Sequence, residues 1–307
     1  VLEAAGMTRA DSDGGGAVAQ SSPVAARLRM AGLALFALVT CGLAVWACSA
    51  VYRACDNTFG VPLDDSYIHF QFARSFARLS PLEYIRGEPP VAGATSLLWP
   101  ALLALPIALG ASSGALIAFA WLLGFGSLFG QAYEAHEAAR RFMSRPAALA
   151  AGLLVLSFSA NTWFAASAME VVPLGYLLLR SARRSAEYLE GARTPRRVLE
   201  LLILAVAGAL LRPEGALCAG FVGAALLLRG TARSRALGVV ALGAPLLAPL
   251  FNWATTGSAA QTTSLVKWLP FNPYFEGQVA AAIQSRVHLL FSTLLDGRGW
   301  SWAFVPE

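Results

Sequence analysis

Residues 30 to 51 read MAGLALFALVTCGLAVWACSAV, an apolar run that contains no charged side chain. A helix that crosses a bilayer needs roughly 20 mostly apolar residues, so this run is long enough to span one. It is too long for the core of a signal peptide, and we expect it to remain as an anchor helix. Residues 1 to 29 before it are rich in Gly, Ala and Ser, which is typical of a disordered tail, here predicted to be cytoplasmic.

The composition extends this prediction to the rest of the chain. Of its 307 residues 57% are hydrophobic and 13% are charged, about half the charged share of an ordinary soluble domain. Leu and Ala are abundant, which favours helices over the alternating strands of an outer-membrane barrel. The formal charge of +5 comes from Arg between apolar runs rather than from a long basic tract with interleaved aromatic residues, so nucleic acid is not an expected partner. The predicted class is an all-α polytopic membrane protein surrounded by membrane lipid.

Further apolar runs recur along the chain. They cover residues 97–109, 115–133, 147–163, 171–179, 198–211, 216–228 and 236–253. The run 97–109 is short and contains Pro100 and Pro106, so it is the weakest candidate to cross a membrane. We therefore expect about seven spanning helices within residues 30 to 253.

The arginines predict how these runs are threaded, because Lys and Arg in short loops stay on the cytoplasmic side. They gather in four clusters, at residues 27–29, 140–145, 180–197 and 229–235. Three apolar runs, 30–51, 97–109 and 115–133, lie between the first two clusters. If all three crossed the membrane, the second cluster would lie outside, so one of these runs is predicted not to cross. We expect residues 97–109 to lie in the membrane interface or to dip in as a re-entrant helix. Residues 52–114 then form a long first extracytoplasmic loop, and residues 254–307 lie on the same side.

Two adjacent acids, Asp64 and Asp65, stand in this first loop in the stretch LDDSYIHF, residues 63–70. The apolar residues that follow at helical spacing are Ile68, Phe72, Phe76 and Leu79. This pattern predicts an amphipathic helix on the outer membrane surface, with the two acids at its start. Helix capping would explain one Asp, whereas two acids near the bilayer favour a general base that deprotonates an acceptor hydroxyl. His69 lies one turn after Asp65 and could orient it.

Further ionisable residues are predicted on the same side as the two acids. Glu170 directly precedes an apolar run. It is either a residue of the functional site or an acid that the helix dipole favours at a helix N-terminus. Arg212 and Glu214 flank Pro213 between two apolar runs. They could form a structural salt bridge, or Arg212 could hold a phosphate, because its planar guanidinium matches phosphate oxygens. Lys267, among Thr and Ser residues, is a second candidate for phosphate.

The ordered set of these motifs resembles the GT-C superfamily of polyprenyl-phosphate-sugar-dependent glycosyltransferases. The matching stretches are LDDSYIHF at 63–70, GATSLLW at 93–99, AME at 168–170 and LRPEG at 211–215. Within the superfamily they look most similar to bacterial proteins akin to the mycobacterial terminal arabinofuranosyltransferase. The GATS and AME segments depart from the Gly-Tyr-Thr and Gly-Met-Glu patterns of the family. The chain is also short for the family, which indicates a fragment or a degenerate member.

The resemblance implies an inverting enzyme of the bacterial inner (plasma) membrane with its active site on the extracytoplasmic face. The donor would be a sugar on a polyprenyl phosphate, and the acceptor a hydroxyl of a cell-envelope glycan or lipid. Asp64 or Asp65 corresponds to the catalytic base, and the Arg212 region would face the donor phosphate. A divalent metal bridging Asp64, Asp65 and Glu170 is chemically feasible, although carboxylates alone do not specify one. The alternative function is a non-enzymatic envelope transporter or membrane scaffold that uses the same acids for binding.

Overall fold

The computed structural model describes residues 23–261, 278–281, 283–285 and 287–288. Within these ranges the chain forms helices and no strands, as the composition predicts. The main helices are α1 (Pro23–Ala54), α2 (Asp64–Ala77), α3 (Leu98–Ala108), α4 (Ser113–Ala139), α5 (Arg145–Ser157), α6 (Ser159–Ala166), α7 (Val171–Leu189), α8 (Pro195–Leu211), α9 (Ala216–Arg229), α10 (Ala232–Gly243) and α11 (Leu247–Thr256). There are also two short 3₁₀ turns, η1 (Pro213–Gly215) and η2 (Ala244–Leu246), and residues 279–281, 283–285 and 287–288 are helical.

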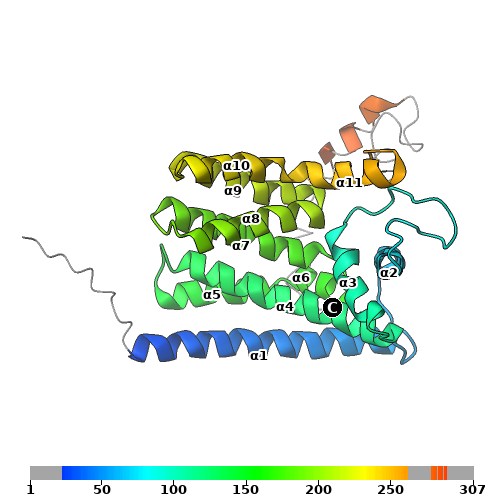
Figure 1. Cartoon of the computed structure of the whole chain (residues 1–307). Helices are drawn as coiled ribbons and strands as arrows, with labels where there is room; N and C mark the ends of the chain where they lie inside the picture. Colours follow the sequence, from blue (N-terminus) through cyan, green and yellow to red (C-terminus); the bar gives the residue numbers. More distant parts are fainter. Residues whose placement is uncertain (1–22, 262–277, 282, 286, 289–307) are drawn as a thin grey trace, which may run out of the picture.

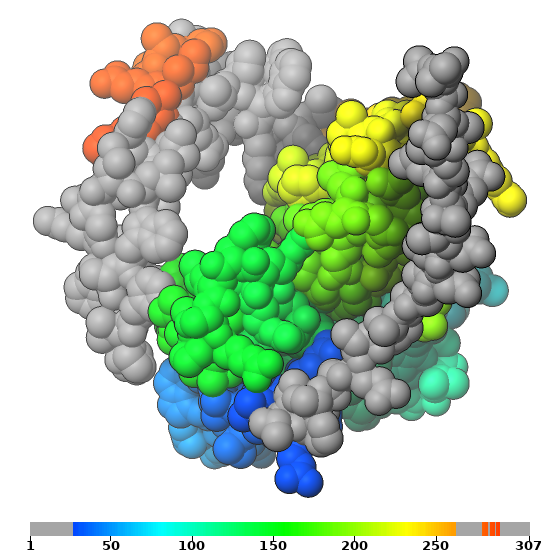
Figure 2. Space-filling model, turned by 90° about the vertical axis from the view of Figure 1, so that its left-hand side faces the viewer, coloured from blue at the N-terminus to red at the C-terminus, as the bar shows by residue number. Residues whose placement is uncertain are grey.

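Most of the helices lie side by side in a bundle with two chemically different ends (Figure 1). One end is called the arginine end. Helix α1 begins there, and the connections from α4 to α5, from α7 to α8 and from α9 to α10 lie there as well. All four predicted arginine clusters lie at or near these junctions. The opposite end, called the loop end, carries α2, α3 and the turn between α8 and α9. Figure 2 views the molecule from the arginine end.

Three helical stretches are long and apolar enough to cross a membrane. They are Arg27–Ala54, Ser113–Ala139 and Ala232–Thr256. The pair α5 and α6 makes a fourth if it counts as one span, with a bend of 51°. The bend falls at Phe158, whose extended backbone interrupts the helix. The structure is thus consistent with a helical membrane protein.

Apolar side chains on the outer surface of the bundle agree with this class. Leu38 is 71% exposed, Leu122 67% and Val240 65%, and each belongs to one of the three long apolar stretches. Large apolar surface of this kind is unfavourable in water but not in lipid. Buried residues such as Phe36 and Leu128 fill the interior between the helices.

The start of α1 corrects the predicted boundary of the tail. The helix begins at Pro23, so residues 23–29 are helical rather than part of a disordered segment. Proline is favoured at the first position of a helix because its missing N–H would have no partner there. Residues 1–22 lie outside the described part of the chain.

Helix α3 is short and lies at the loop end (Figure 1). Its 11 residues extend about 16 Å, roughly half the thickness of the bilayer core. At the other end, Arg29 of α1 donates from Nη2 to the hydroxyl of Tyr133 on α4 at 2.8 Å. The first arginine cluster and the end of α4 therefore meet at one end of the bundle.

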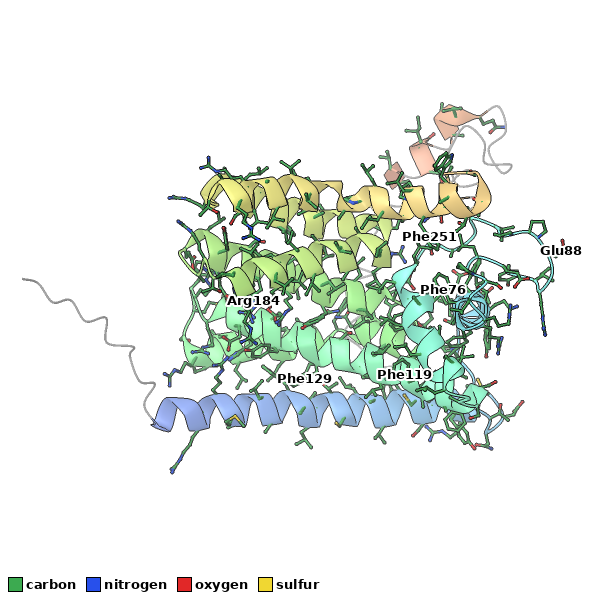
Figure 3. All side chains as sticks on the ribbon, viewed as in Figure 1. Phe76, Glu88, Phe119, Phe129, Arg184 and Phe251 are labelled. Atoms are coloured by element: carbon green, nitrogen blue, oxygen red, sulfur yellow. The ribbon has the colours of Figure 1, made fainter. Side chains whose placement is uncertain are left out.

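Helix α2 forms where the sequence predicts an amphipathic helix, and the face that it buries in the protein includes polar residues. Phe72 is buried, and the ring of Phe76 stacks on Phe251 of α11 with centroids 6.5 Å apart (Figure 3). Ile68 and Leu79, in contrast, are 37% and 90% exposed. The buried face also includes the polar residues Ser66, His69 and Ser75. Polar partners on neighbouring segments account for the burial of Ser66 and His69.

Candidate functional site

Four of the residues predicted from the sequence form one connected chain of ionisable groups at the loop end. Glu170 directly precedes α7, and its side chain is fully buried. Its Oε2 lies 3.1 Å from Nε2 of His69 on α2, whose side chain is 4% exposed. Its Oε1 accepts a hydrogen bond of 2.8 Å from Nη1 of Arg212. Arg212 also donates from Nε and Nη2 to the carboxylate of Glu214 at 3.1 and 3.0 Å.

The backbone between α6 and α7 is fixed by side chains from three other helices. Three consecutive carbonyl groups accept hydrogen bonds. The donors are Trp121 Nε1 to Ala166 at 2.7 Å, Ser66 Oγ to Ser167, and Trp99 Nε1 to Ala168 at 3.1 Å. Ala168 has φ +61°, a left-handed conformation that L-residues rarely adopt. The bonds hold the strained turn that delivers Glu170 into the interior.

Arg212 is positioned by a close contact between α8 and the turn that follows it. The residue is extended, and η1 begins at Pro213 directly after it. A Cβ atom on Gly215 would lie 1.8 Å from the carbonyl oxygen of Gly208, so only glycine fits at this approach. The carbonyl of Leu210 accepts a hydrogen bond of 3.0 Å from the backbone N–H of Leu97, which ties the first loop to the same turn.

Within this connected group of side chains, negative and positive charges nearly cancel. Burial by itself would raise the pKa of Glu170, but the adjacent imidazole of His69 and the charge of Arg212 lower it more, so the pKa falls below its usual range. Arg212 likewise lowers the pKa of Glu214, mainly through their hydrogen bonds. Three of the five N–H donors of Arg212 are used in these contacts. The remaining donors and the 26% exposure of its side chain leave it able to contact an anion.

Asp64 and Asp65 occupy the first turn of α2 and are exposed. The Oδ1 atom of Asp64 accepts a hydrogen bond of 2.9 Å from the backbone N–H of Asp65. Neither carboxylate forms an ion pair with another described residue. The prediction that His69 orients Asp65 is wrong in this arrangement, because His69 pairs with the buried Glu170. Its Nδ1 atom has no hydrogen-bond partner within the described part of the chain.

The three carboxylates considered for a divalent metal are not gathered in one place. No group of three or more His, Cys, Asp or Glu residues that could hold a metal ion occurs among the described residues. Both oxygens of Glu170 face other side chains, His69 and Arg212, whereas Asp64 and Asp65 are exposed. Lys267, the second phosphate candidate, lies outside the described residues.

Some residues that shape the site were not predicted from the sequence. Ser66, Trp99 and Trp121 contribute only through their hydrogen bonds to backbone carbonyls of the turn. Ser66 stands directly after the two acids and three positions before His69. Helical spacing therefore places Ser66 on the same face of the helix as His69, and this could have identified it as a site residue. The carbonyl partners come from a distant segment, and no local pattern predicts them. Comparison with protein-family models, curated proteins and solved structures gave no match.

Proposed function

We propose that the chain is a GT-C-type membrane glycosyltransferase that moves a sugar from a polyprenyl phosphate to a hydroxyl of a cell-envelope glycan or lipid. The observation that carries the proposal is the meeting of His69, Glu170 and Arg212 at the loop end. Of these residues, His69 lies on α2, the helix that also carries two exposed acids. The LDDSYIHF, AME and LRPEG stretches that resemble the superfamily supply these residues. The reaction would take place on the extracytoplasmic face of a bacterial inner membrane.

The proposed threading has seven crossings. In addition to the long apolar stretches, α7, α8 and α9 would cross, because they run between the same two ends of the bundle (Figure 1). Their 14 to 19 residues correspond to about 21 to 28 Å of helix, which is shorter than the bilayer core of about 30 Å. The charged second half of α7 would lie at the membrane surface. The arginine end would be cytoplasmic under the positive-inside rule. The loop end and its acids would then face the extracytoplasmic side.

In the proposed reaction Asp64 or Asp65 accepts the proton of the acceptor hydroxyl. The acceptor oxygen forms a bond to the anomeric carbon of the sugar. The bond between that carbon and the phosphate oxygen breaks, and polyprenyl phosphate leaves with the bonding electrons. Attack from the face opposite the leaving group inverts the configuration. The exposure of both carboxylates and their freedom from ion pairs with other described residues support this role.

Arg212 would stabilise the charge that develops on the leaving phosphate. Its guanidinium is partly exposed and has unused donors, while Glu170 and Glu214 fix its orientation. Glu170 and His69 are buried, so we assign them a positioning role rather than contact with the sugar. A guanidinium held in advance needs little reorganisation when phosphate charge appears.

The test is transfer of label from a polyprenyl-phosphate sugar in membranes that contain the full chain. We expect the double variant Asp64→Asn and Asp65→Asn to lower the transfer rate by about 10²–10⁴-fold, the usual contribution of a general base. Glu88→Gln is the matched control, because Glu88 is an exposed acid of the same loop (Figure 3). Undiminished transfer by the double variant would end the catalytic role of the two acids. Absence of transfer by the unaltered chain, with uptake of the sugar lipid into vesicles, would favour a transporter.

A further inference from the structure

A second polar region lies at the arginine end, away from the proposed active site. A groove of about 690 Å³ runs along α7 and α8 there. One part of its lining is strongly basic and comprises Arg180, Arg184, Arg196 and Arg197. Arg184 is labelled in Figure 3. The other part is aliphatic and includes Leu199 and Ile203.

The innermost partner of these arginines is Glu134 of α4, whose side chain is fully buried. Its Oε1 accepts a hydrogen bond of 2.9 Å from Nη1 of Arg180, and its Oε2 accepts one from Nε of Arg183. This pairing anchors the α7 arginines to the bundle interior. Their position is therefore set by a buried anion rather than by the groove alone.

Two further glutamates fix the arginines that line the groove. Glu200 of α8 contacts Arg180 at 2.6 Å, Arg184 at 3.1 Å and Arg197 at 2.8 Å. Glu187 of α7 contacts Arg184 at 2.8 Å and Arg197 at 2.9 Å. Because each guanidinium has five N–H donors, these contacts leave donors free on every arginine of the groove.

The cluster has more positive than negative charge. Its arginines are Arg180, Arg183, Arg184, Arg196 and Arg197, and its glutamates are Glu134, Glu187 and Glu200. Five cations against three anions leave a net charge of +2. Arg196 is exposed and forms no ion pair with the described residues. The groove therefore offers a preorganised site for an anion.

The aliphatic part of the groove continues along the side of α8. Leu199 is 59% exposed, Ile203 58% and Val206 38%. These positions are four and three residues apart, so they form one stripe on the helix. The stripe runs along the outside of α8, from the basic cluster toward the middle of the helix. A ligand that matches both parts has an anionic head and an apolar chain.

We infer that this groove binds the headgroup of an anionic phospholipid from the leaflet at the arginine end. The phosphate would contact Arg184, Arg196 and Arg197, and an acyl chain would follow Leu199 and Ile203. Basic pockets between membrane helices are suited to such headgroups, because guanidinium and phosphate form charge-assisted hydrogen bonds. The inference is independent of the proposed sugar transfer, which concerns the opposite end of the molecule.

The test is lipid retention by the full chain in native mass spectrometry, with phosphatidylglycerol and phosphatidylcholine offered separately. We expect tighter binding of phosphatidylglycerol by the unaltered chain. Arg196→Gln should weaken that binding roughly five-fold, since one basic residue contributes about that much to anionic lipid binding. The Glu134 network is not touched by this substitution, so the thermal unfolding temperature should stay unchanged. Arg229→Gln, at the same end but outside this groove, is the matched control and should retain the preference.

The outcomes distinguish a lipid site from a site for free phosphate and from nonspecific attraction to the arginine end. Equal retention of the two lipids, or equal loss of preference in Arg196→Gln and Arg229→Gln, would overturn the inference. In a second experiment, inorganic phosphate is added as a competitor of phosphatidylglycerol. If it displaces phosphatidylglycerol at comparable concentration, the groove is a site for free phosphate and the lipid assignment is wrong. Failure of phosphate to compete, together with the Arg196-specific loss, supports a lipid whose chain contributes to binding.

Discussion

The imidazole Nε2 of His69 lies 3.1 Å from Oε2 of Glu170, and both side chains are almost completely buried. This contact joins α2, which belongs to the first loop, to the start of α7. Arg212 completes the arrangement from the end of α8 through its 2.8 Å bond to the other oxygen of Glu170. One carboxylate therefore links three segments of the loop end. A buried carboxylate is tolerated because it has a cationic partner in Arg212 and faces the polar imidazole of His69.

Glu170→Gln should destabilise the fold. The substitution removes the anion that Arg212 contacts and leaves a buried amide beside His69, at a cost of about 1–3 kcal/mol. The measurement is the thermal unfolding temperature of the purified chain in detergent. Glu88→Gln, an exposed acid of the first loop, should leave it unchanged. Equal unfolding temperatures for the two variants would show that the buried pair adds nothing to stability.

The effect of Glu170 on stability should depend on pH. Because the pKa of Glu170 is lowered in the folded chain, its stabilisation is complete above the unfolded pKa of about 4.3 and is lost as the pH falls through the lower folded pKa. The difference in unfolding temperature between the unaltered chain and Glu170→Gln should thus be constant at neutral pH and shrink in acid. A difference that grows on acidification would contradict the lowered pKa of Glu170.

At the arginine end, Glu134→Gln should be more costly than the same change at Glu137. Glu134 is fully buried and pairs with Arg180 and Arg183, so its loss leaves two guanidinium groups without their buried anion. Removal of one partner from such a pair costs about 3–5 kcal/mol. Glu137 is partly exposed and pairs with Arg140 at the surface, where an ion pair contributes about 0–1 kcal/mol. Urea-induced unfolding of the two variants measures the difference, and equal losses would argue against the buried network.

The sequence predicts the general arrangement because charge and hydropathy are local properties. Arginine spacing indicates which loops share an end, and the contact between Arg29 and Tyr133 agrees with that threading. The same reasoning predicts that Glu170 and Arg212 lie on one side of the molecule, where the structure joins them. The number of spans stays a prediction beyond the three or four apolar stretches that qualify by length.

The partners of individual polar residues could not be predicted in the same way. Helical spacing predicts α2 and places its apolar stripe on the membrane surface, but it does not predict that polar residues of the helix are buried in the protein. The structure instead buries Ser66 and His69, because the carbonyl of Ser167 and the carboxylate of Glu170 receive them. Those partners belong to a segment far along the chain. Local periodicity therefore predicts that a helix exists, while long-range hydrogen bonding decides which face is buried.

Two glycines in the bundle should respond differently to the same substitution. A Cβ atom on Gly152 of α5 would lie 2.4 Å from Cζ of Phe36 and 2.8 Å from the carbonyl oxygen of Ala132, whereas a Cβ on Gly126 of α4 meets nothing within 4 Å. Gly152→Ala should destabilise the chain by about 1–3 kcal/mol through overpacking. Gly126→Ala should be neutral or stabilising by about 0.5–1 kcal/mol, because Ala favours the helix. Thermal unfolding compares the two, and matching responses would show that the α1, α4 and α5 helices are not packed this closely.

The position of α3 can be tested by labelling single cysteines in intact cells. The native cysteines to be replaced first are Cys41, Cys48, Cys55 and Cys218. Ser113→Cys, directly after the turn that follows α3, and Met143→Cys, at the arginine end, are both exposed positions. If α3 does not cross, a membrane-impermeant maleimide should label position 113 from outside and position 143 only after permeabilisation. With residues 27–29 in the cytoplasm, labelling of position 113 only after permeabilisation would mean that α3 crosses. The arginine clusters at 27–29 and 140–145 would then lie on opposite sides of the membrane, although the contact of Arg29 with Tyr133 places them at one end of the bundle.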